Sequence, residues 1–78
     1  MSDVAQRVAD VVTRTLKIDR GRITDDSRFV EDLGAESIQS VELVASFEEE
    51  FDIEMDDEEA LGVKTVGGAI EFIGKALQ

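Results

Sequence analysis

Apolar residues recur every three or four positions at the start of the chain, a spacing that places them on one face of an α-helix. This face consists of Val4, Val8, Val11, Val12 and Leu16. The pattern predicts a helix from about Asp3 to Leu16, in which Ser2 or Asp3 caps the free N–H groups of the first turn.

The stretch from Lys17 to Glu36 has no sustained period. It contains two glycines and several Asp, Ser and Thr residues that favour turns, so it is predicted to be a long connection. Its apolar residues are expected to anchor it to the core, and they are Ile18, Ile23, Phe29, Val30 and Leu33. Long loops in compact domains often carry function.

Helical patterns return after this connection. One helix is predicted from about Ser37 to Phe51, and a short helix after Asp56, with Asp56 and Glu59 spaced as an N-cap and an N3 acid. Thr65 is expected to cap a last helix. The apolar face of that last helix is predicted to be Val66, Ala69, Ile70, Ile73 and Leu77.

These patterns together predict an all-α fold. We expect a small four-helix bundle of three longer helices and one short helix, with a long loop between the first two. Good helix formers dominate, proline is absent and no strand-like alternation is found. The length of 78 residues indicates one domain, residues 1–78.

The helix from Ser37 to Phe51 has an unusual surface. A helical wheel, which advances about 100° per residue, gives a core face made of Val41, Leu43, Val44, Phe47 and Phe51. The opposite side holds Gln39, Glu42, Ser46 and Glu49. Ile38 and Ala45 fall outside the core face, beside the glutamates, while Val41 and Glu48 lie at its other margin. This strip is either ordinary exposed apolar surface or the centre of a docking surface.

Charge is distributed unevenly along the chain. The formal net charge is −11, and between Phe29 and Val63 there are 13 acidic residues and no Lys or Arg. Such a field repels nucleic acid and anionic membranes, and it either solvates one face or attracts proteins with basic patches. The N-terminal stretch is polar and no apolar run reaches the roughly 20 residues of a membrane span, so we expect a cytoplasmic monomer that does not insert into membranes.

Ser37 is the candidate for chemistry. Local sequence predicts that it is a helix N-cap. A catalytic serine needs a base, and the chain has no histidine and no cysteine, so we do not expect a self-sufficient nucleophile. Another enzyme could instead modify the Ser37 hydroxyl. A phosphate attached there would lie at a helix N-terminus, where the free N–H groups and the helix dipole favour negative charge.

The segment from Asp52 to Val63 partly matches a calcium-binding loop. Asp52, Glu54, Asp56 and Glu58 alternate like the early ligands of an EF-hand, but Asp57 occupies the glycine position and the position of the closing glutamate is a valine. We therefore predict no dedicated metal site.

Several motifs resemble those of acyl carrier proteins. They are FVEDLGA at residues 29–35 with a serine shortly after it, VELV at 41–44, FEEEF at 47–51, RVADVV near the start and TVGGAIEFI near the end. The resemblance extends over essentially all of the chain.

The resemblance implies that Ser37 carries a covalent 4′-phosphopantetheine arm, attached by a separate phosphopantetheinyl transferase. The thiol of the arm would hold acyl groups as thioesters, and the chain itself would not be an enzyme. The implied partners are this transferase and the acyl-transferring or synthase enzymes of fatty-acid, lipid or polyketide-type biosynthesis, which dock through basic patches.

The resemblance also implies two sets of site residues. The partner-binding set is Glu36, Ile38, Gln39, Val41, Glu42, Ala45, Glu48, Glu49, Met55 and Asp57. The acyl-chain pocket would be lined by Phe29, Leu43, Phe47, Met55, Ala60, Val63, Ala69 and Phe72, all of which could equally be plain core.

The attachment motif departs from the usual Asp-Ser-Leu-Asp of the family. The chain has Glu36-Ser37-Ile38-Gln39, in which Glu36 adds a methylene group and Gln39 loses a charge. These departures favour a specialised carrier as one option. The alternatives are a peptidyl or aminoacyl carrier and an acidic interaction module that is never modified.

Overall fold

The computed structural model describes residues 3–78 and is all-α. Its elements are α1 (Asp3–Leu16), a short 3₁₀ turn (Arg20–Arg22), α2 (Ser37–Phe51), α3 (Asp57–Leu61) and α4 (Val66–Ala76). The predicted bundle of three longer helices and one short helix is confirmed. The 3₁₀ turn was not predicted, and Ser2, one of the two candidate caps of α1, lies outside the described residues.

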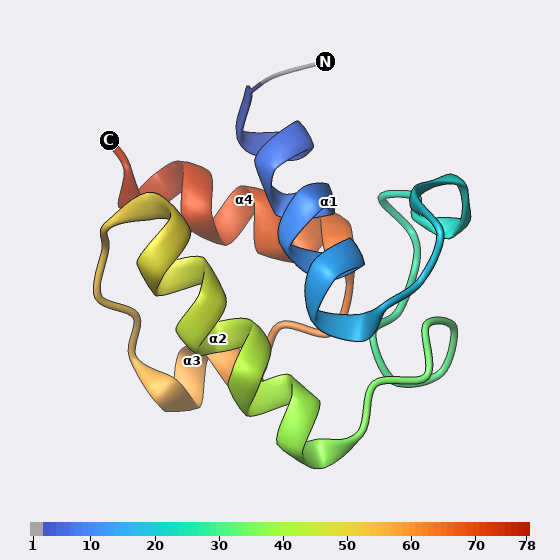
Figure 1. Ribbon diagram of the computed structural model, residues 1–78. Helices are drawn as coiled ribbons and strands as arrows, with labels where there is room; N and C mark the ends of the chain where they lie inside the picture. The colour runs from blue at the N-terminus through green and yellow to red at the C-terminus, as the bar shows by residue number, and fades with distance from the viewer. Residues whose placement is uncertain (1–2) are drawn as a thin grey trace.

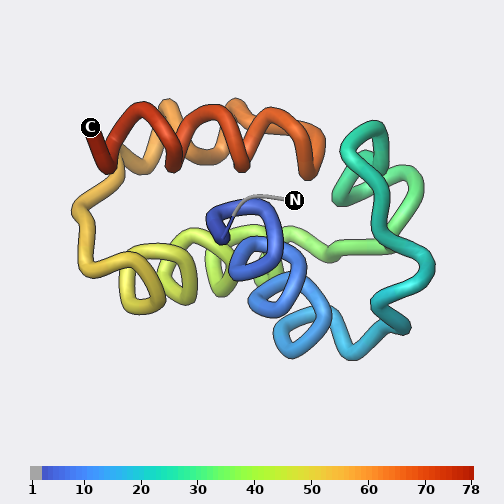
Figure 2. The backbone as a smooth tube through the Cα atoms, turned by 90° about the horizontal axis from the view of Figure 1, so that it is seen from above, coloured from blue at the N-terminus to red at the C-terminus, as the bar shows by residue number. Residues whose placement is uncertain are grey.

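The helices surround a single core. Helix α1 packs against both α2 and α4, and α3 packs against α2. The long loop between α1 and α2 lies at one end of the bundle in both views (Figures 1 and 2). The short α3 and its flanking segments connect α2 to α4, and α3 packs mainly against α2.

The core is formed mainly by apolar residues of α1, α2, α4 and the long loop. Val8, Val11, Val12 and Ile73 have no exposed surface. The other members of the central cluster are Leu16, Phe29, Leu33, Ala35, Leu43, Phe47, Phe51, Val66 and Ala69.

Three residues assigned to the core from the sequence lie on the surface instead. Val30 is 53% exposed because it lies in the turn before Gly34, whose N–H group donates to the Val30 carbonyl. Leu77 is 44% exposed because α4 ends at Ala76, before the apolar face reaches it. Val41, which the helical wheel put at the margin of the core face and the resemblance put in the partner-binding set, is 58% exposed.

The long loop is held to the start of α4 by hydrogen bonds. Val66 N–H donates to the Ser27 carbonyl at 3.0 Å, and Gly67 N–H donates to the Asp25 carbonyl at 2.8 Å. These loop carbonyls satisfy donors that the first turn of any helix leaves without a partner. A Cβ atom on Gly67 would lie 2.9 Å from the Asp25 carbonyl oxygen, so this close approach requires glycine.

Helix α1 also holds the far end of α2. The Arg7 guanidinium lies 4.4 Å from the centre of the Phe51 ring, and its Nε lies 2.9 Å from the Glu50 carboxylate. The hydrogen bond from Arg7 lowers the pKa of Glu50 below its usual value. Asp52 then ends α2 in the left-handed conformation, with φ of 53°.

Candidate functional site

A tight turn at Gly34 immediately precedes α2. Gly34 adopts φ of +74°, a conformation that favours glycine. On either side of it Leu33 and Ala35 are buried, and Ala35 N–H donates to the Phe29 carbonyl at 2.8 Å. The backbone is therefore anchored in the core immediately before it emerges at Glu36.

An ion pair fixes the same turn. The Asp32 carboxylate accepts hydrogen bonds from the Arg28 guanidinium at 3.1 Å and from the Arg28 backbone N–H at 2.8 Å. These bonds lower the pKa of Asp32 and raise that of Arg28. Asp32, the second acidic residue of the FVEDLGA motif, thus closes the turn.

The N-cap of α2 is Glu36, so the sequence-based assignment of this role to Ser37 is wrong. Glu36 has extended backbone angles, with φ of −86° and ψ of 166°. Its N–H group donates to the Gln39 side-chain oxygen at 2.9 Å. This is the reciprocal bond of a capping box, which an N3 Gln makes as well as an N3 Glu.

Ser37 is consequently the first residue of α2. It is exposed, and no residue in the range 3–78 forms a hydrogen bond with its hydroxyl. A phosphodiester on this oxygen would lie beside the free N–H groups and the positive end of the dipole of a 15-residue helix. The site therefore fits a covalent phosphate-linked group.

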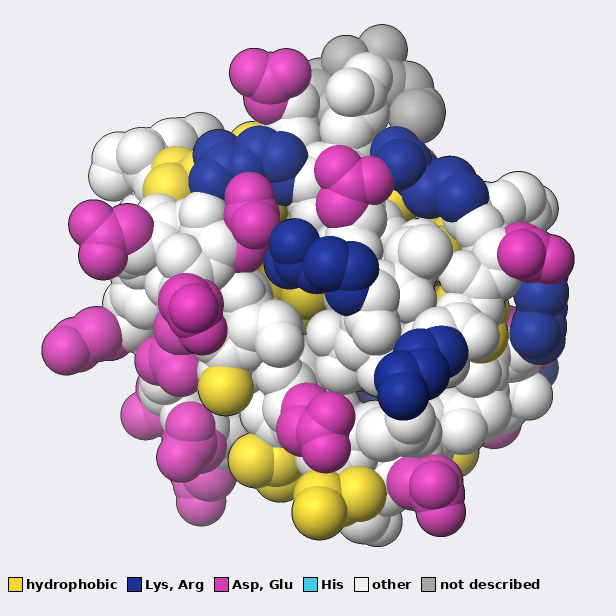
Figure 3. All heavy atoms as spheres, viewed as in Figure 1, with side chains coloured by type: hydrophobic (Ala, Val, Ile, Leu, Met, Phe, Trp, Pro, Cys, Tyr) yellow, Lys and Arg dark blue, Asp and Glu magenta, His cyan; other side chains and the backbone are white. Residues whose placement is uncertain are grey.

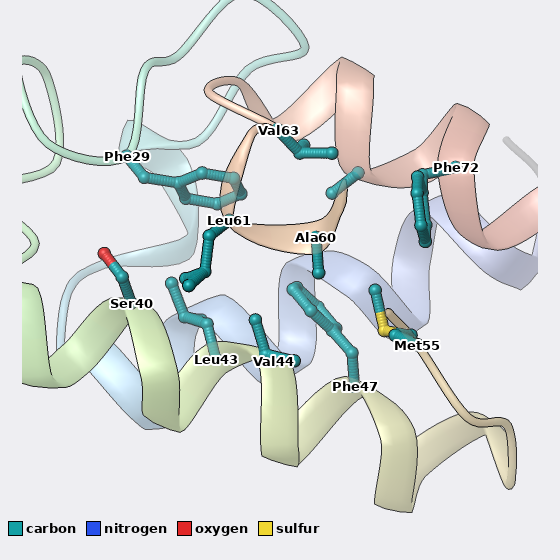
Figure 4. Close-up of a pocket in the computed structure, with 11 residues that line it drawn as sticks. Phe29, Ser40, Leu43, Val44, Phe47, Met55, Ala60, Leu61, Val63 and Phe72 are labelled. Atoms are coloured by element: carbon teal, nitrogen blue, oxygen red, sulfur yellow. The ribbon is translucent and has the colours of Figure 1, made fainter. Parts of the chain in front are cut away.

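The eight residues predicted to line an acyl-chain pocket all line one small cavity between α2, α3 and α4. Its volume is about 40 Å³. Phe47 extends from α2 toward Ala60, Phe72 extends from α4 toward Met55, and Phe29 and Ser40 lie at the other end (Figure 4). Ser40, Val44 and Leu61 complete the lining. The sequence reasoning did not include these three, although Ser40 lies three residues after Ser37 on the same helix.

The residues predicted to form a docking face lie mostly on the surface. Ile38 is 69% exposed, and Glu36, Glu42, Ala45, Glu49 and Asp57 are also exposed. Gln39, Glu48 and Met55 are half-buried, because Gln39 caps α2 and the Glu48 carboxylate accepts the Met55 N–H group at 3.0 Å.

Between α2 and α3 lies a shallow surface groove of about 130 Å³, which we call the α2–α3 groove. It is lined by Val41, Val44, Ala45, Glu48, Asp57 and Leu61. Leu61 is 43% exposed and was missed by the sequence reasoning. In Figure 3 acidic side chains gather over the α2–α3 connection and α3, hydrophobic side chains gather where α2 begins, and Lys and Arg gather over α1.

Comparison with known proteins identifies the family. Residues 6–73 match the family model described as a phosphopantetheine attachment site. The chain belongs to the acyl carrier protein family. A solved structure of a proposed acyl carrier protein from Mycobacterium tuberculosis is 32% identical, with a TM-score of 0.86 over 92% of this chain and 96% of that one.

Membership of this family indicates that the protein carries covalent 4′-phosphopantetheine. The resemblance inferred from the motifs is therefore confirmed at the level of family, fold and cofactor. Carrier domains of this family work with phosphopantetheinyl transferases and synthases and are generally not catalytic.

Two features are absent from residues 3–78, the part of the chain that the structure describes. No group of three or more Asp, Glu, His or Cys side chains is arranged to hold a metal ion. No helix in this range is long and apolar enough to cross a membrane.

Proposed function

We propose that this carrier holds acyl groups as thioesters on a phosphopantetheine arm attached to Ser37 and presents them to partner enzymes. The observation that carries the proposal is the exposed Ser37 hydroxyl, which has no hydrogen-bond partner in residues 3–78 and lies at the start of a long helix. The chain supplies the attachment point and a surface that partners recognise. The chemistry that loads and unloads the arm belongs to those partners.

The cavity supports acyl cargo rather than aminoacyl cargo. Among the side chains that line it, only Ser40 is polar, and Ser40 lies at one end. A charged amino group in such a lining would have no counter-charge and would be costly to bury. An alkyl chain, in contrast, would gain roughly 0.8 kcal/mol for each methylene group that it buries.

The surface of α2 and α3 supports docking of basic partners. Exposed Ile38 and Val41 would supply apolar contact, and exposed Glu42 and Glu49 would steer a partner that presents Lys and Arg. Partners of this kind would be the transferase and the acyl-handling enzymes of fatty-acid, lipid or polyketide-type biosynthesis. The cytoplasmic location and monomeric state expected from the sequence stay predictions.

The rival functions are separated by two mass measurements. The protein is coexpressed with a phosphopantetheinyl transferase, and its intact mass is measured before and after incubation with an acyl-loading enzyme. An acyl carrier gains one arm and then one acyl group. An interaction module gains neither, and an aminoacyl carrier gains the arm but is loaded only by an enzyme that activates amino acids.

A further inference from the structure

A second groove on the surface lies behind one end of the cavity. This outer groove runs between α3 and the end of α4, has a volume of about 390 Å³, and is lined among others by Glu59, Lys75 and Ala76. Met55 and Phe72 line the outer groove and also line the cavity, whose volume is only about 40 Å³. These two side chains therefore form a wall between the cavity and the surface.

The wall can part without disturbing the core. Phe72 extends from α4 toward Met55 at the end of the cavity opposite Ser40 (Figure 4). Both wall side chains are half-buried, whereas Phe47 is only 4% exposed, so they can turn outward into the groove without leaving a void among buried residues. Met55 is flexible at its thioether, and its N–H group stays bonded to the Glu48 carboxylate at 3.0 Å while the side chain moves.

The α2–α3 groove also adjoins the cavity, through Val44 and Leu61. These two residues lie nearer to Ser40, which is one turn after the attachment site, whereas Met55 and Phe72 lie at the opposite end (Figure 4). A chain that enters near Ser40 and runs the length of the cavity therefore meets the wall of Met55 and Phe72 last.

We propose that the far end of a long acyl chain passes between Met55 and Phe72 and lies in the outer groove. The cavity then acts as a tunnel from the arm to this groove. Chains longer than the cavity can be carried, and so can long chains with a polar far end, because that end group stays in contact with water. The proposal rests on the carrier function proposed above, because the chain enters from an arm on Ser37.

The tests attach the chain without a transferase, so they do not depend on enzymatic modification. The sequence has no cysteine, so the thiol introduced by Ser37→Cys reacts alone with a maleimide that carries a linker of pantetheine length and an acyl chain held as an amide. Hexanoyl, octanoyl, decanoyl and dodecanoyl chains are compared, each with a methyl or a hydroxyl group at its far end. Failure of the native protein to accept the arm from a transferase would count against the proposed function, and the results with these chains would still stand.

The first test is thermal unfolding of the proteins that carry these chains. The hydroxyl group should lower Tm by several degrees on a hexanoyl chain, whose end lies among apolar side chains. On a dodecanoyl chain it should have almost no effect, while the methyl-ended dodecanoyl chain still raises Tm. The same effect of the hydroxyl group at every length, or no gain in Tm from the methyl-ended dodecanoyl chain, would overturn the proposal.

The second test removes one half of the wall. Phe72→Ala is compared with the matched control Leu61→Ala, which shortens a side chain between the cavity and the α2–α3 groove. The loss of Tm caused by the hydroxyl group should vanish at a shorter chain length in Phe72→Ala and at an unchanged length in Leu61→Ala. The reverse result would overturn the proposal and assign the exit to the α2–α3 groove. If Phe72→Ala does not fold, Phe72→Leu takes its place.

The third test locates the end of the chain by NMR. Nuclear Overhauser contacts from the ¹³C-labelled terminal methyl group of a dodecanoyl chain should reach the side chains of Lys75 and Ala76, which line the outer groove. Contacts to Ala45 would place the end in the α2–α3 groove, and contacts only to Phe29 and Leu43 would show that the chain folds back inside the cavity. Either of these two results would overturn the proposal.

Discussion

Phe47 is predicted to set how much cargo the cavity can take. It is buried on the core face of α2, with 4% of its surface exposed, and it lines the cavity together with Phe72. The cavity of about 40 Å³ is close to the volume that one water molecule occupies in the liquid, about 30 Å³. Only the first few carbons of a chain fit before Phe47 or Phe72 must move.

The energies follow from this volume. At about 24 cal/mol per Å³, the existing cavity of about 40 Å³ costs the unloaded protein about 1 kcal/mol, which a short chain would recover. Phe47→Leu enlarges the cavity and should cost about 1–2 kcal/mol, less than the 3–5 kcal/mol of a buried Phe→Ala change. In a domain of this size, each kcal/mol corresponds to about 4–8 °C in Tm.

The assay is thermal unfolding of the native protein and Phe47→Leu, unloaded and carrying acyl chains of increasing length on the arm. The gain in Tm should level off at a short chain length in the native protein, because longer chains displace Phe47. In Phe47→Leu the gain in Tm should continue to increase with longer acyl chains. Equal gains at every length would refute the reasoning and make Phe47 ordinary core.

Three further predictions concern the scaffold and the docking surface. Gly67→Ala should lower the free energy of unfolding by about 1–3 kcal/mol in denaturant titration, because the new Cβ atom would meet a loop carbonyl. The control is Gly74→Ala in the same helix, whose new Cβ atom would have no neighbouring residue within 4 Å, and it should be neutral or stabilising. The pKa of Glu50 lies below its ordinary 4.5, so the ionised carboxylate stabilises the native state at pH values above 4.5. The difference in unfolding free energy between the native protein and Glu50→Gln should therefore shrink as the pH falls through the lowered pKa of Glu50. A difference that does not change with pH would contradict this role of Glu50. Glu42→Lys should slow association with the transferase and make the association rate less dependent on salt, whereas Ile38→Ser should weaken binding without changing that salt dependence. Stopped-flow measurements at several salt concentrations test this. The same salt dependence in Glu42→Lys and Ile38→Ser would contradict it.

The sequence predicted the helices well, because their signals are local. The apolar spacing of α1 and the cap at Thr65 depend on neighbouring residues, and Thr65 does accept the Gly68 N–H group at 3.0 Å. The resemblance to the family then identified eight residues of α2, α3, α4 and the loops that line the cavity.

The errors came from contacts between elements and from competition between adjacent caps. Val41 was placed both on the core face and in the partner-binding set, because a helical wheel does not show which positions of α2 the neighbouring helices cover, and its 58% exposure agrees with the second assignment. Ser37 was taken as the cap because serine is favoured there, whereas the pairing of Glu36 with Gln39 moves the cap back by one residue. Leu61 was missed because a short helix gives no clear period, and so the α2–α3 groove could not be foreseen.

The central claim is that the arm is attached at Ser37, and site-specific loss of modification tests it most directly. Native protein, Ser37→Ala and the matched control Ser40→Ala, which alters a serine one turn along α2, are each incubated with coenzyme A and a phosphopantetheinyl transferase. Because Ser37 is not the cap, its replacement should change the free energy of unfolding by less than about 0.5 kcal/mol. Intact-mass measurement should show one phosphopantetheinyl group on the native protein and on Ser40→Ala and none on folded Ser37→Ala. A full mass shift in Ser37→Ala would contradict the account.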